Sequence, residues 1–247
     1  LKSRGVLVRG AEVIEIGPGA AFGPMAYLAA FGLRVAVADR WLAPWQAGYH
    51  DQYYRLLAEK IALDDRGADA CLIRTLADRG GYEGGAIEII RHSAETLDAD
   101  HRNRFDAIFS NAVLEHVADV ERSLLACAHA TRPGGWGFHQ IDFRDHRNFD
   151  RPLDHLLALR HEFEALSKKA YHEFGSARRR DEYDDAFRAA GFEIVSHEPQ
   201  AADADYVKEL RARLMTGSPD QRRLAQSATL ADTGGFYVVR RTGTGPA

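Results

Sequence analysis

Short, almost wholly apolar runs alternate along the chain with longer stretches in which apolar residues recur every three or four positions. Runs of the first kind are typical of strands buried in a parallel sheet, and the longer stretches are typical of helices that cover it. The expected strands span residues 12–16, 34–38, 86–91, 105–110, 136–142, 192–197 and 234–240. The expected helices span residues 24–31, 51–62, 69–78, 117–130, 152–172 and 181–190, with two short ones before the last strand. This alternation predicts an α/β fold with a doubly wound, mostly parallel sheet.

The first expected strand runs directly into a turn that contains two glycines. Residues 13–19 read Val-Ile-Glu-Ile-Gly-Pro-Gly. Glycine permits a tight turn and lets a ligand approach the backbone, because it has no side chain. The second strand ends at Asp39, twenty residues after Gly19, where a carboxylate can accept hydrogen bonds from ribose hydroxyls. The turn and the acid together predict a site for a nucleoside-like ligand.

Two residues around this turn distinguish between the possible ligands. A nicotinamide dinucleotide site favours a third glycine three residues after Gly19, where its pyrophosphate meets the helix, but Phe22 stands in that part of the turn. Glu15 would also lie unfavourably beside a diphosphate, whereas it suits a ligand with a free ammonium group. S-adenosylmethionine has an ammonium group, a ribose and a sulfonium cation, and it carries no phosphate.

With these motifs the chain resembles the class I S-adenosylmethionine-dependent methyltransferases, over residues 13–144 and the closing strand. Ala21 replaces the third glycine of the family's first motif, and the 105–111 strand and the Arg132-Pro133-Gly134-Gly135 turn match further family motifs. The resemblance implies a Rossmann-like sheet of seven strands with an antiparallel last strand, S-adenosyl-L-methionine as cofactor and S-adenosyl-L-homocysteine as product. The cofactor-binding residues that it implies are Glu15, Gly17, Gly19, Asp39, Arg40, Ser93, Ala94, Glu95, Asn111 and Ala112.

The groups that act on the methyl acceptor are expected at the ends of the fourth and fifth strands. Methyl transfer needs an acceptor held close and in line, and a hydroxyl acceptor also needs a group that takes its proton. Residues 139–146 read His-Gln-Ile-Asp-Phe-Arg-Asp-His, and this segment is similar to methyltransferases of surface-polysaccharide and glycan-modifying clusters. The similarity implies O-methylation of a small-molecule or sugar acceptor, with a histidine as base and an aspartate that orients it. The candidate catalytic residues are His139, Asp142, Asp145, His146 and His116.

Each of these candidates also has a structural interpretation. His139 can be a strand histidine that the backbone satisfies, Asp145 and His146 can form a cap, and His116 can be a surface residue at a helix start. Carboxylates would suit Mg²⁺, but one acid pair without a clear third ligand leads us to expect no metal. Two other functions remain open: an NAD-dependent dehydrogenase, and a catalytically inactive, cofactor-binding partner protein.

Composition limits the partners and the location. With 36 acidic against 32 basic residues, the net charge is −4, so the chain has no general attraction for nucleic acid. No run approaches the roughly 20 apolar residues of a membrane span, and the first residues lack the apolar core of a signal peptide. We therefore expect a cytoplasmic protein that binds neither nucleic acid nor membrane, with Cys71 and Cys127 as buried free thiols. The oligomeric state is not predicted.

The expected organisation is one methyltransferase domain over residues 1–247. Two polar, helical stretches interrupt the regular alternation, at about 40–83 and 150–175, and we expect both to be insertions. The run Arg178 to Arg180 lies just after the second insertion. It could hold an acidic acceptor, because guanidinium groups pair bidentately with such anions, or it could pair with the nearby acids Asp181, Glu182 and Asp184.

Overall fold

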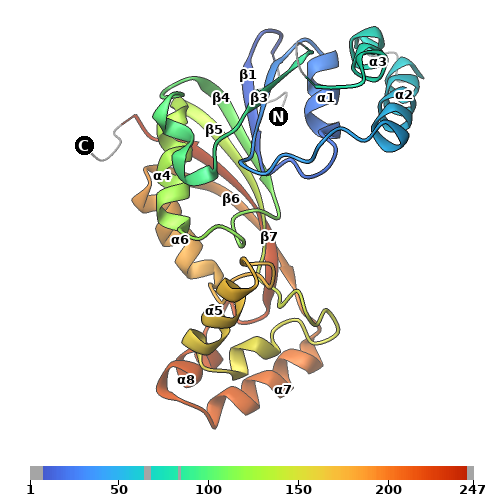
Figure 1. Cartoon of the computed structure of the whole chain (residues 1–247). Helices are drawn as coiled ribbons and strands as arrows, with labels where there is room; N and C mark the ends of the chain where they lie inside the picture. Colours follow the sequence, from blue (N-terminus) through green and yellow to red (C-terminus); the bar gives the residue numbers. More distant parts are fainter. Residues whose placement is uncertain (1–7, 64–67, 83–84, 244–247) are drawn as a thin grey trace.

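The fold is built on one seven-stranded sheet, seen edge-on near the centre of Figure 1. The computed structural model describes residues 8–63, 68–82 and 85–243. The strand order is β3-β2-β1-β4-β5-β7-β6, and β7 is antiparallel to both of its neighbours while the other pairs are parallel. The strands are β1 (Glu12–Ile16), β2 (Arg34–Ala38), β3 (Ile87–Ile90), β4 (Phe105–Asn111), β5 (Thr131–Asp142), β6 (Phe192–Ala201) and β7 (Asp232–Arg241). The predicted fold class is thus confirmed.

Helices cover both faces of the sheet, since alternate residues of each buried strand point to opposite faces. Val13 packs in a cluster with residues of α1, α2 and α3, and Ile14 packs in another with residues of α4 and α6. Figure 1 shows these two groups of helices on opposite sides of the strands. The helices are α1 (Gly23–Ala30), α2 (Ala47–Leu63), α3 (Ala70–Arg79), α4 (Val120–Ala130), α5 (Arg160–Lys169), α6 (Arg180–Ala189), α7 (Ala204–Met215) and α8 (Pro219–Gln226), with short 3₁₀ helices η2 (Ala94–Ala99) and η3 (Asp154–Leu157).

A separate helical lobe lies beyond one end of the sheet, at the bottom of Figure 1. It combines two segments far apart in the sequence, because η3 and α5 follow β5 whereas α7 and α8 lie between β6 and β7. Its own apolar cluster joins Leu153 and Leu156 to Leu210 and Leu214. The sequence predicted the short helices before the last strand but not their packing against the 150–175 insertion. The single-domain assignment stays a prediction.

The stretch 152–172 is not one helix, contrary to the sequence-based expectation. It is divided into η3 and α5, and Ala158 and Leu159 between them are extended. The side-chain amide of Gln221, on α8, donates to the backbone carbonyl of Leu157 at 2.8 Å and also contacts the carbonyl of Leu156. These carbonyls therefore bond to α8 rather than to a continuing helix.

Two smaller expectations also need correction. Helix α4 begins at Val120 rather than at residue 117, because the Asp119 carboxylate accepts a hydrogen bond from the backbone of Arg122 and caps the helix there. Both cysteines are free thiols, but Cys71 is exposed and only Cys127 is buried.

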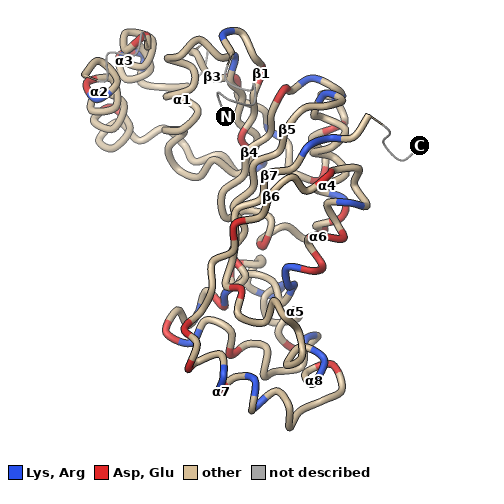
Figure 2. The backbone as a smooth tube through the Cα atoms, turned by 180° about the vertical axis from the view of Figure 1, so that it is seen from behind, with Lys and Arg blue, Asp and Glu red and all other residues tan. Residues whose placement is uncertain are grey.

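The surface agrees with the near-balanced composition. Figure 2 shows basic and acidic positions interspersed along the chain rather than separated by sign. Within the ranges that the structure describes, no helix is long and apolar enough to cross a membrane. The expectation about a leader segment rests on the first residues, and residues 1–7 lie outside the described ranges.

Candidate active site

The glycine turn after β1 is held between the neighbouring strand and the loop after β4. Gly17 has φ of +62° and donates its backbone N–H to the Ala38 carbonyl at 2.9 Å. A Cβ at Gly17 would lie 2.5 Å from Cγ2 of Val113, a distance that no real side chain tolerates. Backbone conformation and close approach therefore both require glycine at this position.

Glu15 places a carboxylate within the sheet, next to this turn. It lies on β1 between Val37 of β2 and Phe109 of β4, and it is 7% exposed. Its Oε2 atom is buried without a hydrogen-bond partner among the residues described. Burial raises the pKa of Glu15 to about 7. Because an isolated buried carboxylate is unfavourable, this position suits a ligand with a positive charge.

The other residues expected to bind the cofactor follow the ends of β2, β3 and β4. These strands are parallel neighbours of β1 or β2, so their carboxyl ends share one edge of the sheet. The Asp39 carboxylate accepts a hydrogen bond from the backbone of Trp41 at 2.8 Å. Ala112 has a left-handed φ of +53°, which bends the chain directly after β4. Arg40, Asn111 and Ala112 are exposed, whereas Asp39, Ser93, Ala94 and Glu95 are half-buried at the end of β2 or the start of η2.

Helix α2 fastens the glycine turn from the other side. The Nε2 atom of His50 lies 2.7 Å from the carbonyl oxygen of Ala20, and its Nδ1 lies 2.8 Å from the backbone nitrogen of Gln46. The Tyr54 hydroxyl accepts a hydrogen bond from the backbone of Phe22. His50 and Tyr54 are almost wholly buried. The sequence offered no signal for His50, because its partner lies thirty residues away.

Aromatic residues of this first insertion divide between core and surface. Trp45 stacks on Tyr54 with ring centroids 5.5 Å apart. Phe22, at the position that disfavours a dinucleotide, is fully buried and packs on Tyr82 with a centroid distance of 4.3 Å. Trp41 is 80% exposed. Trp45 and Tyr54 therefore pack in the core on this side of the sheet, while Trp41 lies on the surface.

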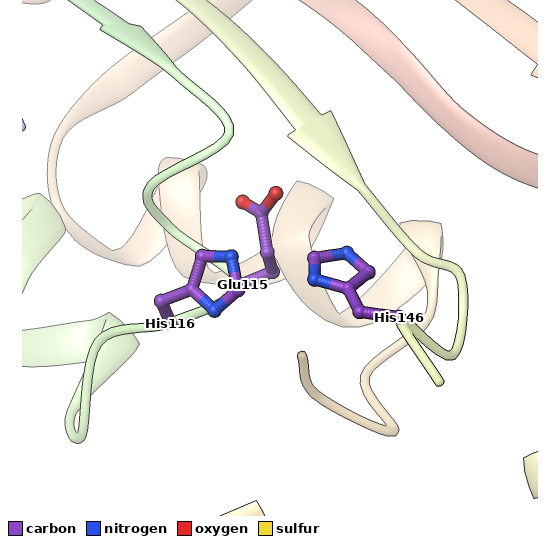
Figure 3. A group of neighbouring side chains, drawn as sticks. All are labelled: Glu115, His116 and His146. Atoms are coloured by element: carbon purple, nitrogen blue, oxygen red, sulfur yellow. The ribbon is translucent and has the colours of Figure 1, made fainter. Parts of the chain in front are cut away.

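Four polar side chains meet where β4 and β5 end, and Figure 3 shows three of them: Glu115, His116 and His146. We call these three residues, together with Asp142, the polar cluster. The imidazoles of His116 and His146 have centroids 4.9 Å apart. The Asp142 carboxylate lies 3.6 Å from Nε2 of His146 and pairs with the Arg144 guanidinium at 2.6 Å. Glu115 is 1% exposed and accepts a hydrogen bond from the backbone of Asp142 at 3.3 Å.

The environments of these groups shift their pKa values in different directions. Burial raises the pKa of Glu115 to about 7 and lowers the pKa of His116. The Asp142 carboxylate raises the pKa of His146. Burial favours the neutral form of Asp142, but the nearby His146 imidazole and the hydrogen bonds from Arg144 outweigh it and hold the pKa of Asp142 below its usual range. The site thus combines an ionised carboxylate with two imidazoles and a second, more easily protonated carboxyl.

The remaining two catalytic candidates lie apart from this contact network. His139 is fully buried, its Nδ1 lies 2.7 Å from the Ser110 hydroxyl, and burial lowers its pKa to about 3. Asp145 is 5% exposed and pairs with the Arg147 guanidinium at 2.7 Å. Glu115 was not among the site residues expected from the sequence, although its position beside His116 was the available signal for its role in the cluster.

The arginine run is engaged within the protein. Arg178 pairs with Glu121 at 2.6 Å, and Arg180 pairs with Asp232 at 3.4 Å. Arg179 is 4% exposed and donates hydrogen bonds to the backbone carbonyls of Phe143 and Leu230. These contacts join α6 to the end of β5 and to the segment before β7. Of the acid partners that the sequence suggested, Asp184 lies 4.0 Å from Arg180 and Glu182 accepts from the backbone of Arg179, whereas Glu121 and Asp232 were not expected.

Comparison with known proteins agrees with the fold and identifies the family. The sequence model of a family described as a methyltransferase domain matches residues 4–197. The chain belongs to this family. It is an S-adenosylmethionine-dependent methyltransferase, and the dinucleotide alternative is not supported.

Relatives of this methyltransferase include small-molecule enzymes. It is 23% identical over 202 residues to the ubiquinone biosynthesis O-methyltransferase of Nitrosospira multiformis, covering 68% of this chain and 82% of that protein. It superposes with a TM-score of 0.52 on an S-adenosylmethionine-dependent methyltransferase from Mesorhizobium loti, at 17% identity over 97% of this chain and 96% of that one. The phosphoethanolamine N-methyltransferase 2 of Haemonchus contortus has the same TM-score at 15% identity, over 98% of this chain and 51% of that one. Several other curated relatives match this chain over only about a third to a half of their lengths.

Proposed function

We propose that this methyltransferase transfers a methyl group to a hydroxyl of a small-molecule acceptor. One observation carries the proposal: the loop after β4 contacts the glycine turn and also supplies the polar cluster. Val113 packs against Gly17, and two residues later Glu115 and His116 meet His146. A cofactor at the glycine turn and an acceptor at the polar cluster would therefore be neighbours, as an in-line transfer requires.

The residues at the glycine turn suit S-adenosylmethionine. Gly17 lets Val113 pack closely against the turn, and the Glu15 carboxylate oxygen, which has no partner among the described residues, can accept from an ammonium group. Asp39 can accept from the ribose hydroxyls, and Glu95 from the adenine amine. When bound, the cofactor supplies an electrophilic methyl group on a sulfonium that leaves as a neutral thioether. Further contacts are assigned to Gly19, Arg40, Ser93, Ala94, Asn111 and Ala112.

The polar cluster would handle the proton of the acceptor hydroxyl. His116 and His146 present two imidazoles to the same space, and Asp142 orients His146. An imidazole positioned by a carboxylate can draw the proton from a hydroxyl as its oxygen attacks. His139 and Asp145 are assigned positioning roles, because His139 contacts Ser110 at the end of β4 and Asp145 holds Arg147 in the following loop.

The relatives support the chemistry only at a coarse level. The Nitrosospira multiformis protein is named as an O-methyltransferase of ubiquinone biosynthesis, which favours an oxygen acceptor. A glycan acceptor receives no support from the comparisons, so the proposal is restricted to a small hydroxylated molecule.

The proposal is tested by binding and turnover together. We expect calorimetry to detect S-adenosylmethionine and S-adenosylhomocysteine but not NAD. We then expect S-adenosylhomocysteine release with phenols, catechols or other small alcohols, and a methylated oxygen in the product by mass spectrometry and NMR. Amines of similar size serve as the control panel. Methylation of amines alone, or cofactor binding without turnover of any hydroxyl compound, would overturn it.

A further inference from the structure

We propose that Glu115, His116 and His146 form a binding site for one divalent transition-metal ion. Each residue offers one ligand atom, and the three atoms all lie within 4.8 Å of one another (Figure 3). The residues come from the loop after β4 and the loop after β5, which the sheet brings together. This inference extends the proposed function, since it concerns how the same acceptor site would work, but ion binding itself can be measured without any acceptor.

The carboxylate of Glu115 is the first independent sign of a cation. Glu115 is 1% exposed, and its Oε2 atom has no hydrogen-bond partner in the described part of the chain. In Figure 3 the Glu115 side chain rises between the two imidazole rings, and its carboxylate lies above them in this view. A buried carboxylate oxygen without a partner is costly unless a positive charge lies beside it. A metal ion between the rings would supply that charge.

A backbone carbonyl orients the His116 imidazole for ligation. Nδ1 of His116 lies 2.7 Å from the carbonyl oxygen of His172, so the N–H of that ring is used there and the lone pair of Nε2 is left available. Besides Asp142, the backbone of Glu173, the residue after His172, lies beside His146 and favours its protonated form, which raises the pKa of its imidazole. Nε2 of His146 has no hydrogen-bond partner among the residues described. A ligating histidine normally donates its other N–H to a carbonyl or carboxylate, and Nδ1 of His116 follows that pattern.

The donor set indicates the class of ion. Two imidazole nitrogens and one carboxylate oxygen are typical of Zn²⁺, Fe²⁺, Co²⁺ and Mn²⁺ sites, whereas Mg²⁺ prefers oxygen ligands. Tetrahedral ligands about 2 Å from an ion are separated by about 3.4 Å, so the three side chains would draw together by about 1 Å on binding. Asp142, 3.6 Å from Nε2 of His146, would then lie beside the ion and add a further negative charge next to it.

Three protein ligands leave a coordination position open, as in catalytic zinc sites. In the ion-bound protein His146 would be a ligand rather than a free base. An acceptor hydroxyl at the open position would be acidified by the ion and would lose its proton to solvent, which makes its oxygen a better nucleophile. No free imidazole would then be needed at the moment of transfer.

The test uses full-length protein without a histidine tag, freed of metal with a chelator. We expect Zn²⁺ to bind with one site per chain in calorimetry, and Co²⁺ to give the visible absorption of a low-coordinate site. Loss of a hydrogen-bond partner of a ligand typically weakens metal binding 10- to 100-fold. Glu115→Gln and His146→Ala change the ligands themselves, so each should weaken Zn²⁺ binding about 100-fold or more. His161→Ala, which removes an exposed histidine outside the polar cluster, should leave binding unchanged. Calorimetry with S-adenosylhomocysteine shows that each variant retains the fold.

The outcomes separate this inference from the proposed function. Absence of saturable binding, or binding that Glu115→Gln and His146→Ala both retain, would overturn the metal site. Full methyl transfer by metal-free protein would remove the ion from the mechanism and leave the proposed function intact. Site-specific ion binding without transfer to any hydroxyl compound would keep the metal site and remove the proposed function.

Discussion

Nε2 of His50 lies 2.7 Å from the carbonyl oxygen of Ala20, and this contact fastens helix α2 to the glycine turn. The contact restrains the loop on which the cofactor would lie, so ligand binding has less chain left to order. His50→Ala removes two hydrogen bonds from a buried position, one with the Ala20 carbonyl and one with the backbone of Gln46, and only the bond to Ala20 reaches the turn. Since such a bond contributes about 0.5–1.5 kcal/mol, we expect affinity for S-adenosylhomocysteine to fall about three- to tenfold in calorimetry. Leu56→Ala, at an exposed position of the same helix, should leave the affinity unchanged. Equal affinities of the two variants would show that the His50–Ala20 contact does not affect cofactor binding.

Gly17→Ala should abolish measurable cofactor binding, because the new methyl group would displace Val113 in the loop that borders the turn. Gly10→Ala is the matched control. Gly10 has φ of +83°, and no described atom beyond its chain neighbours lies within 4 Å of a Cβ built there. Both variants should lose about 1–2 kcal/mol of stability from the left-handed backbone, but only Gly17→Ala should lose affinity by calorimetry. Normal binding by Gly17→Ala would show that the turn is not the cofactor site.

Glu15 should make cofactor affinity depend on pH. Its pKa of about 7 in the free protein means that it is mostly protonated below neutral pH. A bound ammonium group favours the carboxylate, so binding must release a proton once the pH falls below 7. We therefore expect the affinity for S-adenosylmethionine to fall as the pH decreases from 7 to 5.5, with a slope that approaches tenfold for each pH unit.

Glu115 also has a pKa of about 7, so a pH dependence alone does not identify the titrating group. Comparison of wild type with Glu15→Gln shows whether Glu15 is that group. The variant should bind more weakly at pH 8 and show a flatter pH profile in calorimetry. An unchanged slope would place the titrating group elsewhere.

Asp98 should contribute to stability through its two partners. Its carboxylate accepts hydrogen bonds from Arg122 at 2.5 Å and from Nδ1 of His129 at 2.8 Å. Desolvation raises the pKa of Asp98, but these two partners outweigh it and lower the pKa overall. Breaking a buried pair costs about 3–5 kcal/mol, and because the Arg122 side chain is 40% exposed we expect about 2 kcal/mol for Asp98→Ala in urea unfolding at pH 7.

The lowered pKa also sets the pH range of this contribution. It is present above the pKa of Asp98 in the unfolded chain and is lost as the pH falls through the lower pKa of the folded state. The difference between wild type and variant should thus shrink below about pH 4. Asp78→Ala, which removes an exposed partner of Arg55, should change stability by less than about 0.5 kcal/mol. A constant difference at all pH values would exclude the ion pair as its cause.

The parts of the fold and site that depend on neighbouring residues in the sequence could be predicted from it. The apolar runs located the seven strands, and the glycine turn with Glu15 led to the cofactor. Features that depend on long-range contacts could not be predicted in this way. The break between η3 and α5 coincides with a bond from the Gln221 amide, more than sixty residues later, and the role of His50 depends on its contact with a carbonyl thirty residues away. Glu115 could not be separated from an ordinary helix-entry residue until β4 and β5 were placed side by side.

The position of β7 has a consequence for how the molecule assembles. β7 lies between β5 and β6, although it follows both of them in the sequence. During synthesis the facing edges of β5 and β6 therefore wait unpaired until β7 has left the ribosome, and such open edges invite association with other chains. The two halves of the helical lobe precede β7, so their early packing would hold β5 and β6 apart by one strand width. The lobe would then act as a spacer that keeps the gap ready for the last strand.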